Sequence, residues 1–185
     1  MEKTIKFGIF GLGRGSGFYD GVAANNGEVV AVCDIIEERA QFLKDNYFPD
    51  AVVYTDYKEL LGDESIDSVD ICTPNYLHSI IAVAAFEAGK HVFCEKPDAV
   101  SVEEALRMDA VAKKAGKTLM IMRNNRFVAP SQYAKKYIDA GKMGEIYCGR
   151  CGWQRRRGIP GRGGWFTTKE QSGGGPLIDL GVHMI

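Results

Sequence analysis

The sequence predicts an α/β fold in which a doubly wound parallel sheet comes first. Short apolar runs alternate with helical patterns of about 10–15 residues, which is typical of repeated βαβ units. The runs are apolar throughout, as in parallel strands that helices cover on both faces. A glycine-rich turn directly follows the first run. We therefore expect strands at residues 4–10, 28–33, 51–54, 69–72, 91–94 and 118–122.

The helical patterns between these strands carry recognisable end signals. Residues 101–115 open with Ser-Val-Glu-Glu, a capping-box pattern, and are followed by Gly116. Residues 77–88 are likewise followed by Gly89, a residue type common directly after a helix. Helices are expected at residues 16–24, 37–46, 57–61, 77–88 and 101–115.

The pattern changes after residue 123, which divides the chain into residues 1–123 and 124–185. In the second part we expect a helix over 130–140, a long strand over 145–154 and a helix from Leu177 onward. A single strand would expose an unpaired edge, and so few elements bury little apolar surface. We interpret residues 124–185 as the incomplete start of a substrate domain, and the chain as part of a longer protein.

The charge balance narrows the range of partners. The 23 Lys and Arg residues nearly match the 24 Asp and Glu residues, so nothing attracts the whole chain to nucleic acid or to anionic membranes. No stretch approaches the roughly 20 apolar residues that span a bilayer, and the first residues lack a signal-peptide cleavage site. We expect a cytoplasmic protein with neither nucleic-acid nor membrane partners.

The cysteines do not indicate a metal site. Cys148 and Cys151 form a CxxC pair, but no second Cys/His pair stands at the spacing of zinc ligands. In the strand expected here, residues three apart point to opposite faces. We therefore predict no metal.

The glycine-rich turn predicts a dinucleotide site. Gly11-Leu12-Gly13-Arg14-Gly15-Ser16 lies between a predicted strand and a predicted helix, where Gly11 would allow the tight turn and Gly13 the approach of a pyrophosphate. Asp34 ends the second predicted strand, near the roughly 20-residue spacing of the carboxylate that binds the adenosine ribose. A carboxylate repels a 2′-phosphate, which favours NAD over NADP. Alternatively, Asp34 caps the next helix.

Lys96 is the first candidate catalytic residue. It follows the fifth predicted strand, and Pro97 restricts it to an extended conformation. Thr73-Pro74-Asn75 follows the neighbouring strand, and ligands of such sheets bind beyond the carboxyl ends of the strands. The alternative is a solvated surface lysine.

Asp179 and His183 are the other two candidates. Their i, i+4 spacing places them on one face of the predicted helix, where they can touch. A carboxylate beside an imidazole fixes its tautomer and raises its pKa, which suits a general base. The alternative is an ordinary surface pair.

Four segments together resemble a known family. These are the Gly-Leu-Gly turn, CTPNYLHS at 72–79, GKHVFCEKP at 89–97 and GGGPLIDLGVHMI at 173–185. The chain resembles the Gfo/Idh/MocA family of glucose-fructose oxidoreductases and inositol 2-dehydrogenases from residue 4 to its last residue. The resemblance implies an N-terminal Rossmann domain followed by an α+β domain with a mostly antiparallel sheet. Ser16 departs from the glycine or alanine usual at the third motif position.

The resemblance also implies the site. Lys96, Asp179 and His183 match catalytic positions, and Asn125 lies in a segment, RNNRF, near cofactor and substrate. The residues expected to bind the cofactor are Gly11, Leu12, Gly13, Arg14, Gly15, Ser16, Asp34, Thr73, Pro74, Asn75, His78, Glu95, Lys96 and Arg126.

The function predicted from these residues is NAD-dependent hydride transfer between nicotinamide and a secondary alcohol of a sugar, inositol or related polyol. His183 would accept the hydroxyl proton, oriented by Asp179, while Lys96 hydrogen-bonds the same oxygen; Lys96 and His183 could exchange roles. The Trp- and Arg-containing loop over 153–165 would contact the substrate, or would serve as an interface or crossover loop. A homo-oligomer is expected for the full-length protein. The chain lacks most of the sheet that the resemblance implies for the second domain, which puts the activity of this chain alone in doubt.

Two alternatives stay open at this point. One is a glycosidase that keeps NAD bound and cleaves its substrate through transient oxidation. The other is a non-enzymatic sensor of NAD or sugar. Net formation of NADH distinguishes the dehydrogenase from both.

Overall fold

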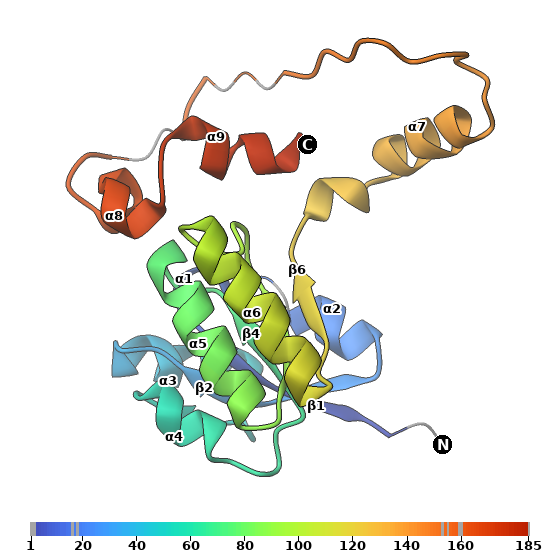
Figure 1. Cartoon of the computed structure of the whole chain (residues 1–185). Coiled ribbons are helices and arrows are strands. Elements are labelled where there is room, and N and C mark those ends of the chain that lie inside the picture. Colours follow the sequence, from blue (N-terminus) through green and yellow to red (C-terminus); the bar gives the residue numbers. More distant parts are fainter. Residues whose placement is uncertain are drawn as a thin grey trace.

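A computed structural model describes residues 3–15, 17, 19–152, 154, 156–158 and 161–184 (Figure 1). Its centre is one parallel sheet of six strands in the order β3-β2-β1-β4-β5-β6. This order reverses between β1 and β4, which makes the sheet doubly wound. The strands are β1 Ile5–Phe10, β2 Gly27–Cys33, β3 Val52–Tyr54, β4 Ser68–Ile71, β5 His91–Cys94 and β6 Leu119–Ile121.

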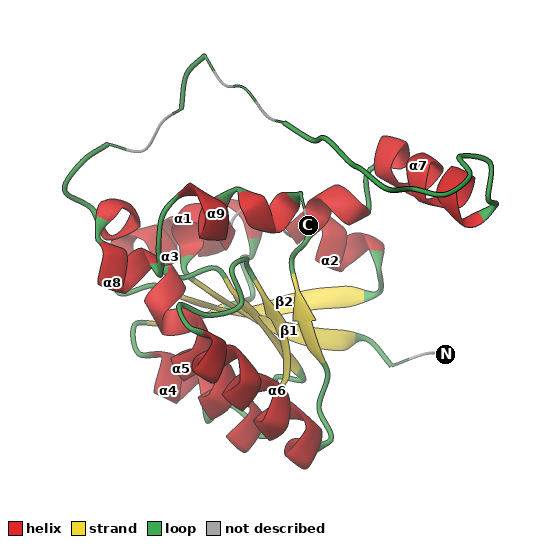
Figure 2. Cartoon of the chain, turned by 45° about the horizontal axis from the view of Figure 1, so that its top comes forward, coloured by secondary structure: helices red, strands yellow, loops and turns green. Residues whose placement is uncertain are grey.

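Helices cover both faces of this sheet. Figure 2 shows α4 Tyr57–Leu61, α5 Asn75–Glu87 and α6 Val102–Ala115 together on one side. On the other face, α3 Glu37–Tyr47 packs against β2 and β3. The alternation of strand and helix predicted from the sequence is thus confirmed.

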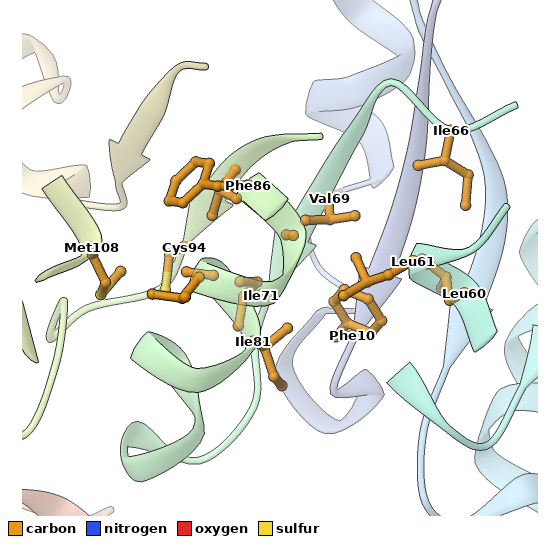
Figure 3. Packing of buried hydrophobic residues seen from close by; sticks show 14 of the residues in the cluster. Phe10, Leu60, Leu61, Ile66, Val69, Ile71, Ile81, Phe86, Cys94 and Met108 are labelled. Carbon is orange, nitrogen blue, oxygen red and sulfur yellow. The ribbon is translucent and has the colours of Figure 1, made fainter. Parts of the chain in front are cut away.

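The larger core lies between β4, β5 and the helices α4 to α6. Figure 3 shows Phe10, Ile71, Phe86 and Met108 among its side chains, all of them fully buried. A smaller core around Ile9 lies beneath α3. Burial of each such side chain stabilises the fold by roughly 1.5–3 kcal/mol. The cores fix the strands, and with them the loops that follow the strands.

The predicted helix ends are largely confirmed, with one correction. The Ser101 side chain accepts a hydrogen bond from the Glu104 amide, and Gly116 ends α6 in the left-handed conformation (φ 64°). Of the helix expected over 16–24, residues 19–24 are helical and Gly17 lies in a turn, whereas Ser16 and Phe18 lie outside the described residues. The glycine-rich turn itself forms the short helix α1 Leu12–Gly15, and α2 begins only at Tyr19 and ends at Ala24.

The chain beyond β6 differs most from expectation. The 3-10 turn η1 Asn124–Arg126 and helix α7 Ala129–Asp139 follow β6, and α7 stands apart from the sheet (Figures 1 and 2). The strand expected over 145–154 is wrong, because the described residues of that segment are exposed and form no regular secondary structure. The described part of the chain has no strand beyond β6 with which this segment could pair. Its backbone N–H and C=O groups are therefore left to hydrogen-bond with water.

The last described residues fold back onto the carboxyl edge of the sheet. They form η2 Trp165–Thr167, α8 Lys169–Ser172, α9 Pro176–Asp179 and η3 Gly181–His183. The single helix expected from Leu177 onward is therefore wrong, because α9 ends at Asp179 and a 3-10 turn follows. Within the described residues, no helix has the length and apolar character to cross a membrane.

Candidate active and cofactor site

The glycine-rich turn is built by a close backbone approach. Gly11 has a φ of +80°, and a Cβ there would lie 2.6 Å from the carbonyl carbon and oxygen of Cys72. Only glycine accommodates both the conformation and the contact. A Cβ on Gly13, in contrast, would meet nothing within 4 Å. The turn thus packs tightly against β4 on one side and leaves open space above Gly13.

Asp34 ties the end of β2 to this turn. One carboxylate oxygen accepts the Leu12 amide at 3.0 Å, and the other accepts the Ile36 amide at 3.0 Å. Helix α3 has Ile36 as its N-cap residue, with no side-chain capping bond, so Asp34 does not cap that helix. Each carboxylate oxygen keeps a second lone pair, which suits it to accept a ribose hydroxyl as well.

The motif residues between these two are only partly described. Arg14 and Gly15 belong to the backbone of α1, whereas Ser16 lies outside the described residues. The same holds for Trp153 and Arg155 of the predicted substrate loop. At its end, Trp165 and Phe166 pack edge to face with their ring centroids 5.0 Å apart.

The loops after β4 and β5 lie side by side, and His78 joins them. The Glu95 amide donates to the Ile71 carbonyl at 2.9 Å. The His78 ring lies between two backbone carbonyls, with Nδ1 2.6 Å from Pro97 and Nε2 2.8 Å from Thr73. Burial lowers the pKa of His78, although the two carbonyls favour the charged form. His78 therefore lies beneath both loops and holds them together.

The Thr73 side chain at this edge leaves a hydrogen-bonding group open. Its hydroxyl is buried and has no hydrogen-bond partner within the described part of the chain. A buried polar group without a partner lowers the stability of the fold, so binding of a ligand that hydrogen-bonds to it would be favoured. Pro74 next to it is the N-cap residue of α5. The buried hydroxyl and the open space at Gly13 both fit a dinucleotide along this edge.

Lys96 is not a solvated surface lysine. Its Nζ donates to the Asp179 carboxylate at 2.5 Å and to the Asp179 carbonyl at 2.9 Å. The two side chains are only 14% and 21% exposed. The Glu95 carboxylate accepts the Lys96 backbone amide at 3.0 Å, which further fixes the loop. The structure thus brings Lys96 and Asp179 together at the carboxyl edge.

Asp179 and His183 are not on one α-helix, contrary to the sequence prediction. Asp179 ends α9, Leu180 follows, and His183 lies in η3. Because the α-helix ends at Asp179 and a 3-10 turn follows, the i, i+4 alignment of an α-helix does not continue to His183. The Asp179 carboxylate pairs with Lys96 instead. The His183 carbonyl accepts the Asn125 side-chain amide at 3.4 Å, which brings the RNNRF segment to this end of the site.

Sequence reasoning missed two contacts at this edge. Arg123 pairs with Asp98 at 3.2 Å and links the end of β6 to the loop after β5. The Asn75 side chain donates to the Ser172 carbonyl at 2.9 Å. Arg126, predicted to bind cofactor, is exposed in η1. The signal for Arg123 was its place directly after the sixth strand.

The described residues hold no group of three His, Cys, Asp or Glu side chains that could bind a metal ion. Cys148 and Cys151 are exposed free thiols.

The strand order and the glycine turn bridged to a buried carboxylate define a dinucleotide-binding Rossmann protein. Comparison with known families makes this more specific. A family model described as an oxidoreductase family with an NAD-binding Rossmann fold matches residues 5–122, and a model of the GFO/IDH/MocA C-terminal domain matches residues 131–185. The chain belongs to the Gfo/Idh/MocA family of oxidoreductases.

Relatives of this chain include dehydrogenases named for a glucoside and for inositols. The chain is 42% identical over 161 residues to D-glucoside 3-dehydrogenase of Escherichia coli (strain K12), covering 87% of this chain and 45% of that protein. It is 31% identical over 182 residues to a scyllo-inositol 2-dehydrogenase (NADP(+)) of Bacillus subtilis (strain 168), covering 98% and 50%. The chain therefore spans about half the length of the curated relatives it matches.

A solved structure of an NAD-binding protein from Listeria innocua superposes with a TM-score of 0.82 at 34% identity. The match covers 98% of this chain and 53% of that one.

Proposed function

We propose that this chain is part of an NAD-dependent dehydrogenase that oxidises a secondary alcohol of a sugar, an inositol or a related polyol. The observation that carries the proposal is the ion pair between Lys96 and Asp179 at the carboxyl edge of a dinucleotide-binding sheet. Relatives named glucoside and inositol dehydrogenases support the substrate class. The Rossmann domain comprises residues 1–123, and the substrate domain starts at residue 124.

The proposed roles follow from position and charge. Lys96, held by Asp179, donates a hydrogen bond to the substrate oxygen and stabilises its developing negative charge. His183 accepts the hydroxyl proton. Bound NAD supplies the acceptor for the hydride of the alcohol carbon. Asp179 thus acts through Lys96, whereas the sequence alone suggested that it acts through His183.

We propose the cofactor to be NAD, although one relative uses NADP(+). The support is Asp34, a buried carboxylate at the end of β2 with no cation following it directly in sequence. A phosphate on the adenosine ribose would meet this negative charge. Around the nicotinamide, we propose that Thr73, Pro74, His78 and Glu95 form the edge on which the ring rests, whereas the side-chain amide of Asn75, expected there from the sequence, bonds to Ser172.

We further propose a homo-oligomer in the cytoplasm. The five cysteines are all free thiols, which fits a reducing compartment. Tyr133 and Ile138 of α7 expose 69% and 40% of their surface, and large apolar side chains of this kind are often covered by another subunit.

The test is a screen of glucosides and inositols for NAD reduction by the full-length protein. We expect net NADH formation with at least one of them. Lys96→Met should lower kcat roughly a hundredfold or more, the usual scale for an acid–base or electrostatic group. Lys113→Met is the matched control, because Lys113 pairs with Asp109 on the exposed face of α6.

Other outcomes would replace the proposal. Release of sugar from a glucoside without net NADH would indicate the glycosidase that uses transient oxidation. Binding of NAD with no turnover of any substrate, unchanged in Lys96→Met, would indicate a sensor.

A further inference from the structure

We propose that Asn75 is a positioning residue that latches the catalytic segment, residues 165–184, onto the cofactor edge of the Rossmann domain. The inference rests on the proposed function, since it assigns a task to the segment that carries Asp179 and His183. In this assignment the Asn75 side chain acts on the protein and not on the cofactor.

The latch begins with a buried hydrogen bond. Asn75 opens α5 directly after the Thr73-Pro74 loop, and its Nδ2 donates to the Ser172 carbonyl at 2.9 Å. Both residues are 5% exposed. Ser172 ends α8, and the last carbonyls of a helix lack partners within the helix. Asn75 supplies one, so the bond also completes the end of α8.

The chain then makes a tight turn against the Rossmann domain. Gly173 has a φ of +86°, and a Cβ there would lie 2.9 Å from the Cα of Val100. The Ser172 hydroxyl donates to the Gly174 carbonyl at 3.0 Å across the same turn. Gly175 follows as the N-cap residue of α9. Ser172 and Asp179 are thus joined by a short turn that packs against the Rossmann domain at Gly173, so the position of Ser172 helps to set that of Asp179.

The far end of this segment is the ion pair with Lys96. Lys96 stands on the loop after β5, whereas Asn75 stands after β4, and His78 already joins these two loops. Two neighbouring loops of one edge therefore bond to the segment, and Asn125 adds a bond to the His183 carbonyl near its C-terminal end. Without the Asn75 bond, the α8 end of the segment loses its side-chain bond to the Rossmann domain, and the position of Asp179 depends more on the Lys96 pair and on the bond from Asn125 to the His183 carbonyl.

The Asn75 assignment differs from that of a direct cofactor ligand. The side-chain amide bonds to Ser172, while the neighbouring Thr73 hydroxyl is buried and has no hydrogen-bond partner in the described chain. A cofactor ligand would affect NAD affinity first. A latch would affect turnover once NAD and substrate are bound.

The experiment compares Asn75→Ala and the nearly isosteric Asn75→Asp with wild type in the full-length protein. Asp lacks the amide donor, so both variants lose the bond to Ser172. We expect kcat at saturating NAD to fall roughly tenfold or more, and the Kd for NAD to change by less than about twofold. Amide hydrogen exchange in residues 165–184 should become faster in both variants.

Two further variants complete the design. Asn46→Ala is the matched control, because the Asn46 amide also donates to a backbone carbonyl, that of Phe42, but on an exposed turn of α3. It should leave kcat and exchange unchanged. Gly173→Ala should mimic Asn75→Ala, and the double variant should lose less than the sum of both effects, because both loosen one latch.

The inference is overturned if the Asn75 variants weaken NAD binding while kcat at saturation stays normal, or if exchange in residues 165–184 does not change. Should the wild-type protein oxidise no polyol, the proposed function fails. The exchange measurement then still decides whether Asn75 latches the segment.

Discussion

The Lys96 ammonium lies 2.5 Å from the Asp179 carboxylate, although 83 residues separate the two along the chain. Lys96 also donates to the Asp179 backbone carbonyl, so the end of α9 supplies two acceptors to one ammonium. Charge-assisted hydrogen bonds of this kind are about twice as strong as neutral ones. The pair therefore both holds α9 on the Rossmann domain and fixes the direction of the lysine.

Asp179→Asn tests the second of these effects. The amide keeps the size of the side chain but removes the negative charge, so the ammonium is less firmly oriented. We expect kcat for polyol oxidation to fall by roughly 10- to 100-fold, less than for Lys96→Met. Asp109→Asn is the control, since Asp109 pairs with exposed Lys113. Wild-type kcat in Asp179→Asn would contradict the role of the pair.

Gly11→Ala and Gly13→Ala form a matched pair that separates folding from cofactor binding. An alanine at Gly11 would have to adopt a positive φ, and its Cβ would clash with the Cys72 carbonyl. We therefore expect thermal unfolding at a clearly lower temperature, because left-handed strain alone lowers the free energy of unfolding by roughly 1–2 kcal/mol. An alanine at Gly13 meets no protein atom within 4 Å.

The Gly13 variant should therefore unfold at the wild-type temperature, but bind NAD roughly tenfold more weakly or worse, because its methyl group fills the space for the pyrophosphate. Calorimetry and NAD titration measure the two effects. Normal NAD affinity in Gly13→Ala would place the cofactor elsewhere.

Asp34 should determine the preference between NAD and NADP. Replacing it by serine and Ile35 by arginine removes the negative charge and supplies a cation at an 89% exposed position. We expect the ratio of kcat/KM for NADP to that for NAD to rise by roughly tenfold or more, since that is the effect of about 1.4 kcal/mol. Asp56→Ser, at the N-cap of α4, is the control. An unchanged ratio would remove Asp34 from the adenosine site.

Asp70 should make stability depend on pH. It is buried in β4, and desolvation raises its pKa from 3.8 to about 7, helped by the charge of Glu95. Between pH 4 and 7 the folded chain therefore holds a proton that the unfolded chain releases, and the free energy of unfolding falls as pH rises through this window. Above the pKa that Asp70 has in the folded chain, this loss in the free energy of unfolding is complete and amounts to on the order of 4 kcal/mol.

Asp70→Asn carries no such charge. Its melting temperature relative to wild type should rise as pH increases from 4 to 7 and then stay constant. Thermal unfolding across this range, with exposed Asp45→Asn as the control, measures the effect. Parallel curves for Asp70→Asn and wild type would show that Asp70 ionises as an ordinary carboxyl group.

The residues at strand ends show what local sequence can predict. Cys33, Ile71 and Cys94 close apolar runs that become buried parallel strands, and a run of buried residues is a property of the segment itself. The same reasoning located Asp34 and Lys96 at the carboxyl edge, because the carboxyl ends of parallel strands meet there. It failed for residues 145–154, since a strand also needs a neighbour to pair with.

By itself, the sequence determined the order of strands and helices, the glycine turn and the family to which the chain belongs, because apolar periodicity and motif spacing are written in neighbouring residues. Only the tertiary structure decided that Asp179 pairs with Lys96 and not along one helix with His183, and that Asn75 reaches Ser172. Such partners are chosen by how distant segments pack, and the break of the helix after Asp179 follows from that packing.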